Sequence, residues 1–249
     1  MKAMIFAAGL GTRLRPLTDS QPKALVPVAG KTMLERVIMQ LKEAGFDNIT
    51  VNIHHFGQQI IDFLRIHDNF GVNIHLSDER NMLLDTGGGI CQARPFLDGN
   101  EPFLIHNVDV MSDTDLVALY RHHLESKAEA TLLVSKRETS RYLLFDNDYQ
   151  LQGWINKSTS EVKPEGFVYR KELFQEYAFG GIHVISPTLF RFMGSGPWTG
   201  KFSIIPFYLS VCRKVRIQGY PLQSSHWFDV GRLETLRQAE EWLTVTEKG

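Results

Sequence analysis

The residues near the N-terminus are of the types that bind a polyphosphate. Residues 7–18 read AAGLGTRLRPLT and follow a short apolar run that predicts a buried strand. Gly9 and Gly11 carry no side chain that would keep backbone N–H groups away from a phosphate. Thr12 adds a hydroxyl donor, and Arg13 adds a guanidinium that suits phosphate oxygens. The pattern predicts a phosphate-binding loop after the first strand, with a structural glycine turn as the alternative.

The spacing of this loop differs from two common nucleotide-binding motifs. Lys23 lies beyond the loop and no Gly-Lys-Ser/Thr sequence follows the glycines, so the segment is not a Walker loop. The third glycine of a dinucleotide-binding loop and an acidic residue about 20 positions later are not in place either. The spacing therefore disfavours a dehydrogenase.

A carboxylate follows another apolar segment. Residues 102–106 predict a strand that runs directly into Asn107, Val108 and Asp109. Open α/β sheets bind their ligands at the carboxyl ends of the strands. Mg²⁺ prefers one or two carboxylates together with phosphate oxygens, so Asp109 is a candidate metal ligand. A turn or helix-cap aspartate is the alternative at this position.

Strands and helices must alternate in the first half of the chain to position these residues. Thr32 and Glu35 form a capping box, after which apolar residues recur at helical spacing until Gly45. The next elements are expected in the order strand, helix, strand at residues 49–54, 58–66 and 72–76. This order is typical of a parallel sheet.

The pattern changes in the second half. Residues 142–185 are strand-like between polar turns, which predicts antiparallel strands added to the same sheet. Asp113 and Thr114 are expected to cap a helix through Leu124. Further helices are expected at residues 187–192, 203–212 and 233–243. No repeat or linker divides the chain, so residues 1–249 are expected to form a single domain.

The composition excludes several classes of partner. The net charge of -1, from 27 basic and 28 acidic residues, gives no field that would attract nucleic acid or an anionic membrane. No segment approaches the roughly 20 apolar residues of a membrane span. Cys91 and Cys212 are too few and too far apart for a disulfide framework or a zinc site, so a reducing compartment is expected. We therefore expect a cytoplasmic protein.

The loop together with Pro22-Lys23 resembles the signature of the sugar-1-phosphate nucleotidylyltransferase family. The resemblance implies an α/β, Rossmann-like nucleotidyltransferase fold with a mixed, mainly parallel central sheet flanked by helices. It implies a nucleotide-binding half of about residues 1–125 and a sugar-binding half of about residues 126–249. It also implies Mg²⁺ as cofactor, held by Asp109 and by Asp229 in the late motif WFDVG.

The same resemblance implies roles for individual residues. Arg13, Lys23 and Asp109 would be catalytic. The nucleotide would be bound by Leu10, Gly11, Thr12, Arg13, Lys23, Thr86, Gly87 and Asn107. The sugar phosphate would be bound by Asn156, Lys157, Gly180 and Gly181, with Lys163 of Val162-Lys163-Pro164 as a second candidate lysine. The chain departs from the family at Val108, where glycine or alanine is common, and before Lys157, where a glutamate is expected.

The compact length, the segment Thr86 to Ile90 and the ending Gly231-Arg232-Leu233-Glu234 look most like the short bacterial N-acetylmuramate-1-phosphate uridylyltransferases of cell-wall recycling. UTP and N-acetylmuramate 1-phosphate are therefore the expected substrates. Mannose-1-phosphate guanylyltransferases share the loop, so GTP remains an alternative. A regulatory protein that binds a nucleotide sugar without turnover is an alternative of another class. Monomer and homodimer both remain open.

Overall fold

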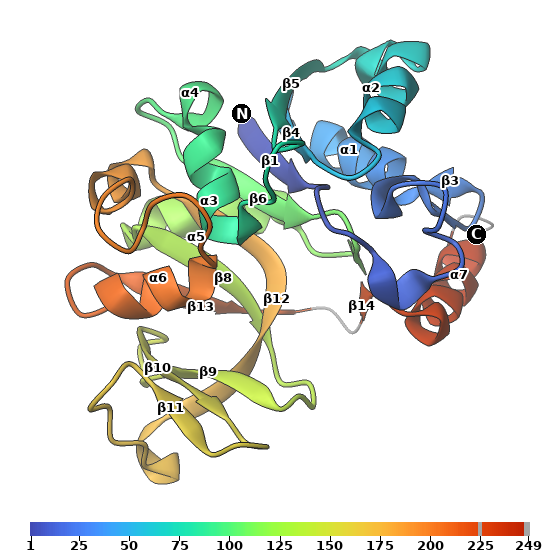
Figure 1. The fold of residues 1–249 in the computed structure, drawn as a ribbon. Helices are drawn as coiled ribbons and strands as arrows, with labels where there is room; N and C mark the ends of the chain where they lie inside the picture. Colours follow the sequence, from blue (N-terminus) through green and yellow to red (C-terminus); the bar gives the residue numbers. More distant parts are fainter. Residues whose placement is uncertain (224–225, 247–249) are drawn as a thin grey trace.

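The computed structural model of the protein describes residues 1–223 and 226–246 (Figure 1). Within them, the main sheet has ten strands. Eight follow the order β11-β10-β9-β12-β6-β1-β4-β5; of the other two, β8 pairs with β12, and β13 pairs with β8. Its parallel part consists of β1 (Lys2–Phe6), β4 (Asn48–Ile53), β5 (Asn73–Asp78) and β6 (Phe103–Asn107). Lys2 of β1 lies opposite Asn48 on one side and Phe103 on the other. The parallel sheet predicted for the first half is confirmed.

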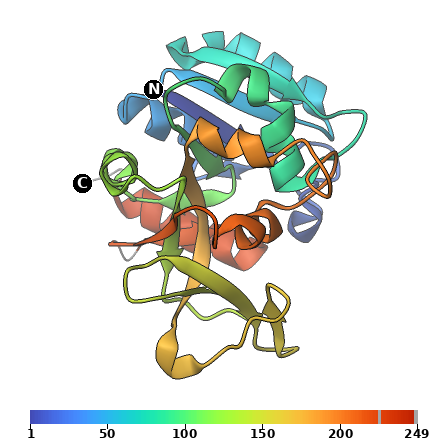
Figure 2. The same ribbon diagram turned by 90° about the vertical axis from the view of Figure 1, so that its left-hand side faces the viewer.

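The second half of the chain adds mostly antiparallel strands. β12 (Gln175–Ile185) pairs antiparallel with β6, β8 and β9, whereas β13 pairs parallel with β8. Strands β9 to β11 form an end of the sheet that projects away from the rest in Figures 1 and 2. The remaining bounds are β8 (Ala130–Ser135), β9 (Arg141–Phe145), β10 (Leu151–Asn156), β11 (Glu161–Lys163) and β13 (Ile217–Pro221). The predicted mixed sheet is therefore confirmed.

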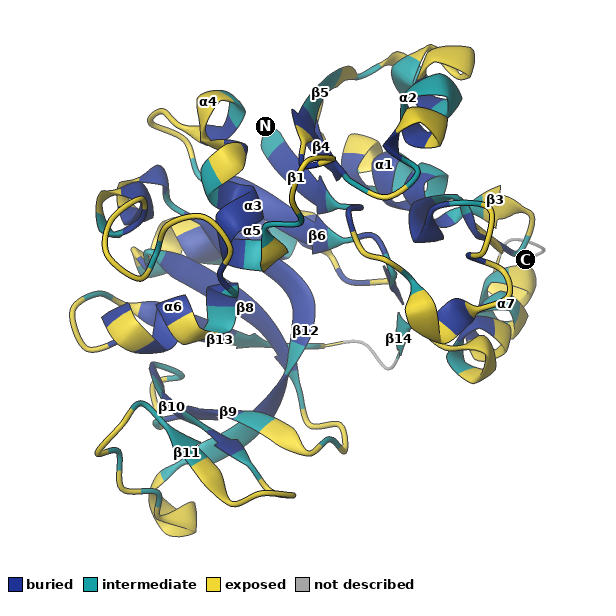
Figure 3. Ribbon diagram, in the orientation of Figure 1, coloured by how far each residue is buried: buried dark blue, intermediate teal, exposed yellow. Residues whose placement is uncertain are grey.

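Helices cover both faces of the sheet because the strands send alternate side chains into two cores. In β1, Ala3 and Ile5 pack into one core and Met4 packs into the other. Side chains of α1, α2, α5 and α7 cover the first core, and those of α3, α4 and α6 cover the second. Figure 3 shows buried residues along the central strands and exposed residues on the outer faces of the helices. The bounds are α1 (Met33–Glu43), α2 (Gly57–Ile66), α3 (Asp85–Gln92), α4 (Arg94–Leu97), α5 (Leu116–Ser126), α6 (Ile204–Val211) and α7 (Leu233–Thr246).

One predicted helix cap is confirmed and another is wrong. The Thr32 hydroxyl accepts the N–H of Glu35 at 3.1 Å at the start of α1, as the capping box predicts. In α5 the cap is Asp115, whose carboxylate accepts a backbone N–H at 2.9 Å. Because α5 begins at Leu116, the predicted caps Asp113 and Thr114 lie before the N-cap position, and the Thr114 hydroxyl accepts a hydrogen bond from the Ser112 hydroxyl at 3.0 Å.

Several short elements complete the described chain. Two-stranded sheets are formed by β2 (Pro27–Val28) with β3 (Lys31–Thr32) and by β7 (Val110–Ser112) with β14 (Trp227–Asp229). The 3₁₀ helices span Thr12–Leu14, Lys23–Leu25, Asp68–Gly71, Lys171–Leu173 and Pro187–Phe192. Among the described residues, no helix is long and apolar enough to cross a membrane. The division into a nucleotide-binding and a sugar-binding half stays a prediction.

Candidate functional site

Two aspartates that are far apart in the sequence meet at the edge of the parallel strands. β7 follows Asp109 directly, and it pairs antiparallel with β14 so that Asp229 lies opposite Val110. The N–H of Val230 also donates to the carbonyl oxygen of Asp109 at 2.9 Å. The small two-stranded sheet therefore brings Asp229, in β14, close to Asp109, in the turn directly before β7.

Each aspartate faces a cation from the N-terminal loop region. Lys23 forms an ion pair with Oδ2 of Asp109, and the two side chains are only 10% and 18% exposed. Arg13 Nη2 lies 3.7 Å from Oδ1 of Asp229, in a pair whose side chains are 51% and 41% exposed. Little water reaches the Lys23–Asp109 pair, whereas water screens the attraction between Arg13 and Asp229. Arg13 is therefore the cation that can move more easily to another anion.

The conformation of the loop depends on Gly11. Its φ of 66° lies in the left-handed region, and a Cβ there would approach Thr18 Cγ2 to 2.9 Å and Lys23 Cβ to 3.0 Å. The Thr18 hydroxyl donates to the Gly11 carbonyl oxygen at 2.9 Å, which fixes the turn. Among the described residues, the N–H groups of Leu10 and Gly11 have no acceptor. These amides are available to an anion, as a phosphate-binding loop requires.

A cavity of about 340 Å³ opens beside the loop. Its lining includes Lys23, Thr86, Asn107 and Asp109 from the predicted site, and Val108 between the last two. It also includes side chains that the sequence analysis did not single out, namely Asn52, Glu79, Leu83, Asp85 and Lys201. Val108, the departure from the family pattern, is 3% exposed, so most of its side chain packs in the core.

Asn52 and Glu79 connect the loops around this cavity. Asn52 Oδ1 accepts the N–H groups of Ala7 and Ala8 at 2.7 and 3.2 Å. Asn52 Nδ2 donates to Glu79 Oε1 at 2.8 Å, and Glu79 Oε2 accepts the N–H of Leu84 at 3.1 Å. Burial raises the pKa of Glu79, while the hydrogen bonds from Asn52 and Leu84 oppose that shift. The pair thus ties the start of the glycine loop to the segment before α3.

The glycines of α3 serve packing. The N–H groups of Gly87 and Gly88 both donate to the carbonyl oxygen of Phe202, at 2.8 and 3.1 Å. A Cβ on Gly87 would lie 2.2 Å from the Phe202 ring, so only glycine permits this approach. The Thr86 hydroxyl accepts the N–H of Ile204 at 2.9 Å and lines the cavity, whereas Gly87 does not line it. The prediction that Gly87 contacts the nucleotide is therefore not favoured by its position.

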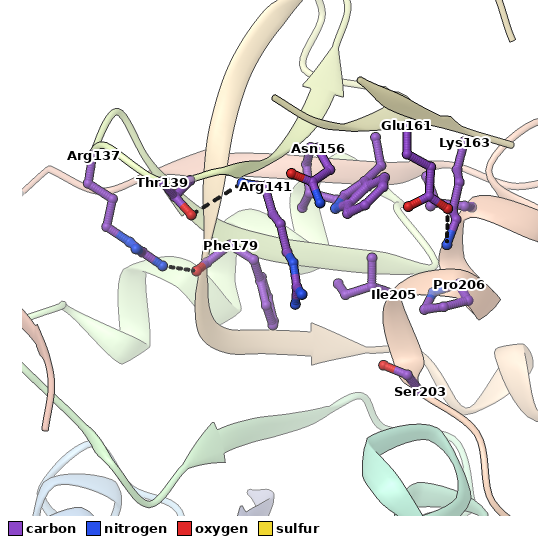
Figure 4. A pocket seen from close by; sticks show the side chains of 13 residues that line it. Arg137, Thr139, Arg141, Asn156, Glu161, Lys163, Phe179, Ser203, Ile205 and Pro206 are labelled. Carbon is purple, nitrogen blue, oxygen red and sulfur yellow. Dashed lines mark hydrogen bonds and ion pairs between the residues drawn. The ribbon is translucent and has the colours of Figure 1, made fainter. Parts of the chain in front are cut away.

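A second cavity of about 490 Å³ lies against the antiparallel end of the sheet (Figure 4). Cross-strand neighbours in β9, β10 and β11 share one face, which lines this cavity: Arg141, Asn156 and Glu161 in one row, and Leu143, Trp154 and Lys163 in the next. Phe179 of β12 and Ser203, Ile205, Pro206 and Leu209 in and next to α6 also line it.

The structure separates the two candidate lysines for the sugar phosphate. Lys163 lines the cavity, with Nζ 3.1 Å from Glu161 Oε1 and 5.1 Å from the centre of the Trp154 ring. Lys157 does not line it and instead forms an ion pair with Glu176 at 2.5 Å. Successive residues of a strand and its continuation point to opposite faces, which explains why Asn156 faces the cavity and Lys157 does not. The structure therefore favours Lys163 over Lys157.

Gly180 and Gly181 lie between the aspartates and this second cavity. Strand β12 has a register shift between Phe179 and His183, and a Cβ on Gly181 would approach Asn107 Nδ2 to 2.9 Å. The carbonyl oxygen of Gly180 accepts the indole N–H of Trp227 at 2.8 Å. The glycine pair therefore carries the backbone from the cavity lined by Phe179 to Asn107.

Arg137 is a cation that the sequence analysis did not identify. Its Nη2 donates to the carbonyl oxygen of Phe179 at 3.1 Å, and its guanidinium lies 4.4 Å from the centre of the Trp227 ring. Loss of hydration lowers the pKa of Arg137, and the charge of Asp229 opposes that shift. Open α/β sheets bind ligands at the carboxyl ends of their strands, so the positions of Asn52 and Glu79 near strand ends could have identified them from the sequence. No pattern in the sequence indicates Arg137.

The donor set at the sheet edge fits Mg²⁺. Asp109 and Asp229 supply hard carboxylate oxygens, and Mg²⁺ is usually bound by one or two carboxylates and completed by phosphate oxygens and water. The described residues contain no group of three or more His, Cys, Asp or Glu side chains that could hold a metal by themselves. Any metal at this edge would therefore depend on oxygens from a substrate or from water.

Comparisons with known proteins show the family of the chain. A family model described as nucleotidyl transferase matches residues 2–245. The chain is 35% identical over 242 residues to the N-acetylmuramate alpha-1-phosphate uridylyltransferase of Neisseria meningitidis serogroup B, covering 96% of this chain and 97% of that protein. It is 30% identical over 237 residues to the mannose-1-phosphate guanylyltransferase catalytic subunit beta of Danio rerio, covering 93% of this chain and 61% of that protein.

Solved structures share the fold. A crystal structure of UDP-glucose pyrophosphorylase complexed with UDP-glucose superposes with a TM-score of 0.76 at 16% identity, covering 98% of this chain and 98% of that chain. The predicted Rossmann-like fold is thereby confirmed. With the family model spanning nearly the whole sequence and the N-terminal loop folded around Gly11, the chain belongs to the nucleotidyl transferase family.

Proposed function

We propose that the protein transfers a uridylyl group from UTP to N-acetylmuramate 1-phosphate, with Mg²⁺, and releases pyrophosphate. The observation that carries the proposal is the placement of two carboxylates, Asp109 and Asp229, and two loop cations, Lys23 and Arg13, at one sheet edge. The choice of UTP and of the sugar is supported by the relative from Neisseria meningitidis, whose length the chain covers almost completely.

The loop side of the site would hold the nucleoside triphosphate. The N–H groups of Leu10, Gly11 and Thr12 would bind phosphate oxygens, and the first cavity would hold the nucleoside beside Thr86 and Asn107. Lys23 and Arg13 would exchange their aspartate partners for phosphate oxygens. Their charges would then stabilise the negative charge that grows on the departing pyrophosphate.

Asp109 and Asp229 are the residues that would hold Mg²⁺. When bound there, the ion would neutralise part of the phosphate charge. The carboxylates of Asp229 in β14 and of Asp109 directly before β7 are suited to this role, and phosphate oxygens would complete the coordination.

The second cavity would hold the sugar 1-phosphate. Lys163 would bind its phosphate, Asn156 would contact the sugar, and the backbone of Gly180 and Gly181 would pass beside it. An oxygen of the sugar phosphate would attack the α-phosphorus of UTP as the bond to the β-phosphate oxygen breaks. The protein's part is to orient the two substrates and to stabilise charge, so no covalent enzyme intermediate is required.

Pyrophosphate release tests this proposal. UTP, GTP, dTTP, ATP and CTP are each combined with the 1-phosphates of N-acetylmuramate, mannose, glucose and N-acetylglucosamine in the presence of Mg²⁺. We expect the highest rate with UTP and N-acetylmuramate 1-phosphate. A higher rate with GTP and mannose 1-phosphate would replace the proposed substrates. If no pair released pyrophosphate although a triphosphate bound measurably, a regulatory protein without turnover would be favoured.

The guanylyltransferase alternative rests on the relative from Danio rerio, although the chain spans only 61% of that protein. The cytoplasmic location of the protein and its role in cell-wall recycling are also proposals. Cys91 and Cys212 are free thiols, which suits the reducing cytoplasm, and the proposed substrate pair would place the protein in cell-wall recycling.

A further inference from the structure

Arg141 stands apart from the other cations that line the second cavity. Lys163 is paired with Glu161, and Arg137 donates to the carbonyl oxygen of Phe179. The backbone N–H of Arg141 donates to the Thr139 hydroxyl at 3.3 Å. Within residues 1–223 and 226–246, its guanidinium has no hydrogen bond and no ion pair.

The strand register directs this unpaired guanidinium into the cavity. Arg141 lies directly opposite Asn156, so both side chains are on the face of the sheet that lines the cavity. Figure 4 shows the Arg141 side chain extending toward Phe179 and Ile205. Arg141 is exposed and its guanidinium has no partner among the described residues, so an anion in the cavity can bind it without displacing a protein group.

We infer that Arg141 binds a carboxylate carried by the sugar of the sugar 1-phosphate. This inference rests on the proposed function, in which the acceptor is N-acetylmuramate 1-phosphate. That sugar is N-acetylglucosamine with a lactyl ether, so its extra anionic group is one carboxylate. A planar guanidinium matches a carboxylate with two parallel hydrogen bonds, a geometry that a lysine ammonium does not offer.

The charges in the rest of the site leave this role to Arg141. Lys23 and Arg13 lie at the two aspartates, where the phosphates must react, and Lys163 lies in the neighbouring row of the sheet. The cavity of about 490 Å³ is large enough for a hexose with a side group, because small-molecule sites usually measure about 300–1,000 Å³. Arg141 is thus the specificity-determining residue for an acidic sugar.

The test compares two sugar 1-phosphates that differ only in the lactyl group. Pyrophosphate release gives kcat and KM for N-acetylmuramate and N-acetylglucosamine 1-phosphates with the wild type, Arg141→Gln and Arg141→Lys. Arg121→Gln, an exposed arginine on α5, is the matched control. A third substrate carries the lactyl group as an amide, which keeps the shape but removes the charge. Calorimetric binding of the same sugars reports on Arg141 independently of turnover, and thermal melting checks the fold.

We expect Arg141→Gln to raise KM for N-acetylmuramate 1-phosphate about 10- to 100-fold, the usual range for a charged hydrogen bond. It should leave KM for N-acetylglucosamine 1-phosphate and for the amide unchanged, and Arg141→Lys should be intermediate. Equal losses for both sugars would overturn the inference, because Arg141 would then bind the shared phosphate. No loss for either would also overturn it.

The inference and the proposed function can fail separately. A wild type that turns over only uncharged sugars would overturn the role of Arg141 and leave the transferase reaction standing. A wild type that releases no pyrophosphate with any pair, yet binds the acidic sugar through Arg141 in calorimetry, would overturn the proposed function alone.

Discussion

The N–H of Val230 donates to the carbonyl oxygen of Asp109 over 2.9 Å, and this bond joins two segments that are 121 positions apart. Because Val230 follows Asp229, the bond fixes the backbone of one candidate metal ligand against that of the other. The geometry of the carboxylates is therefore set by backbone pairing of β7 and β14. Substitutions of the aspartate side chains should consequently change the chemistry of the site more than its fold.

Asp109→Asn should remove most of the turnover. The amide keeps the size of the side chain but loses the charge that would hold Mg²⁺ and that now pairs with Lys23. We expect kcat to fall at least about 100-fold, the usual loss when one strong electrostatic contact to the reacting groups is removed. Pyrophosphate release over a range of Mg²⁺ concentrations measures the effect, with circular dichroism to check the fold. Asp62→Asn on α2 is the control, and unchanged Mg²⁺-dependent activity of Asp109→Asn would refute the site.

Lys163→Gln should weaken binding of the sugar 1-phosphate more than Lys157→Gln does. Lys163 lines the second cavity, whereas Lys157 is engaged by Glu176 outside it. Loss of a charged hydrogen bond predicts a KM for the sugar 1-phosphate about 10-fold or more higher in Lys163→Gln, with little change in KM for the nucleotide. Steady-state kinetics with each substrate varied in turn measures both values. A larger effect at Lys157 would restore the assignment that the sequence favoured.

Asn52→Ala should destabilise the protein and loosen the nucleotide site together. The N–H groups of Ala7 and Ala8 would lose their acceptor, and unsatisfied buried donors cost about 1–3 kcal/mol each. The start of the glycine loop would lose its link to Glu79, so we expect a higher KM for the triphosphate. Asn48→Ala, at the other end of β4, is the matched control because the Asn48 side chain makes no hydrogen bond among the described residues. A loss of stability with an unchanged KM would show that the link serves folding alone.

His183 should make the protein sensitive to acid. Burial lowers the pKa of His183 to about 3 from 6.5, so between these values the unfolded chain takes up a proton that the folded chain does not. Stability from this residue is therefore present above pH 6.5 and is lost as the pH falls, by about 1.4 kcal/mol per pH unit at most.

Urea unfolding between pH 6 and pH 4 measures this dependence. His183→Gln retains a side chain that can bond to the hydroxyl of Tyr208 but cannot titrate, so its stability should fall less steeply. His106 and His123, whose pKa values burial lowers to about 4, should leave part of the slope in the variant. The exposed His67→Gln is the control, and equal slopes for wild type and His183→Gln would contradict the prediction.

The sequence by itself determined the local features. Short apolar runs predicted the parallel strands, because a strand that is buried on both faces carries apolar side chains at nearly every position. The capping box at Thr32 and the loop around Gly11 also depend on short-range geometry, so their residues could be recognised without the fold. Asp109 and Asp229 were paired through family resemblance alone, since nothing in their spacing shows that β7 and β14 meet.

Only the tertiary structure decided which side chains share a cavity. The sequence favoured Lys157, with Lys163 as the second candidate, but the alternation of faces in β10 and the register of β11 direct Lys163 into the cavity and Lys157 to Glu176. Likewise, the sequence predicted that Gly87 contacts a ligand. In the structure its N–H donates to the carbonyl oxygen of Phe202, and the absence of a side chain leaves room for the Phe202 ring from a distant loop. Such contacts join segments whose pairing depends on the whole chain packing at once, which is why residue types near each position did not reveal them.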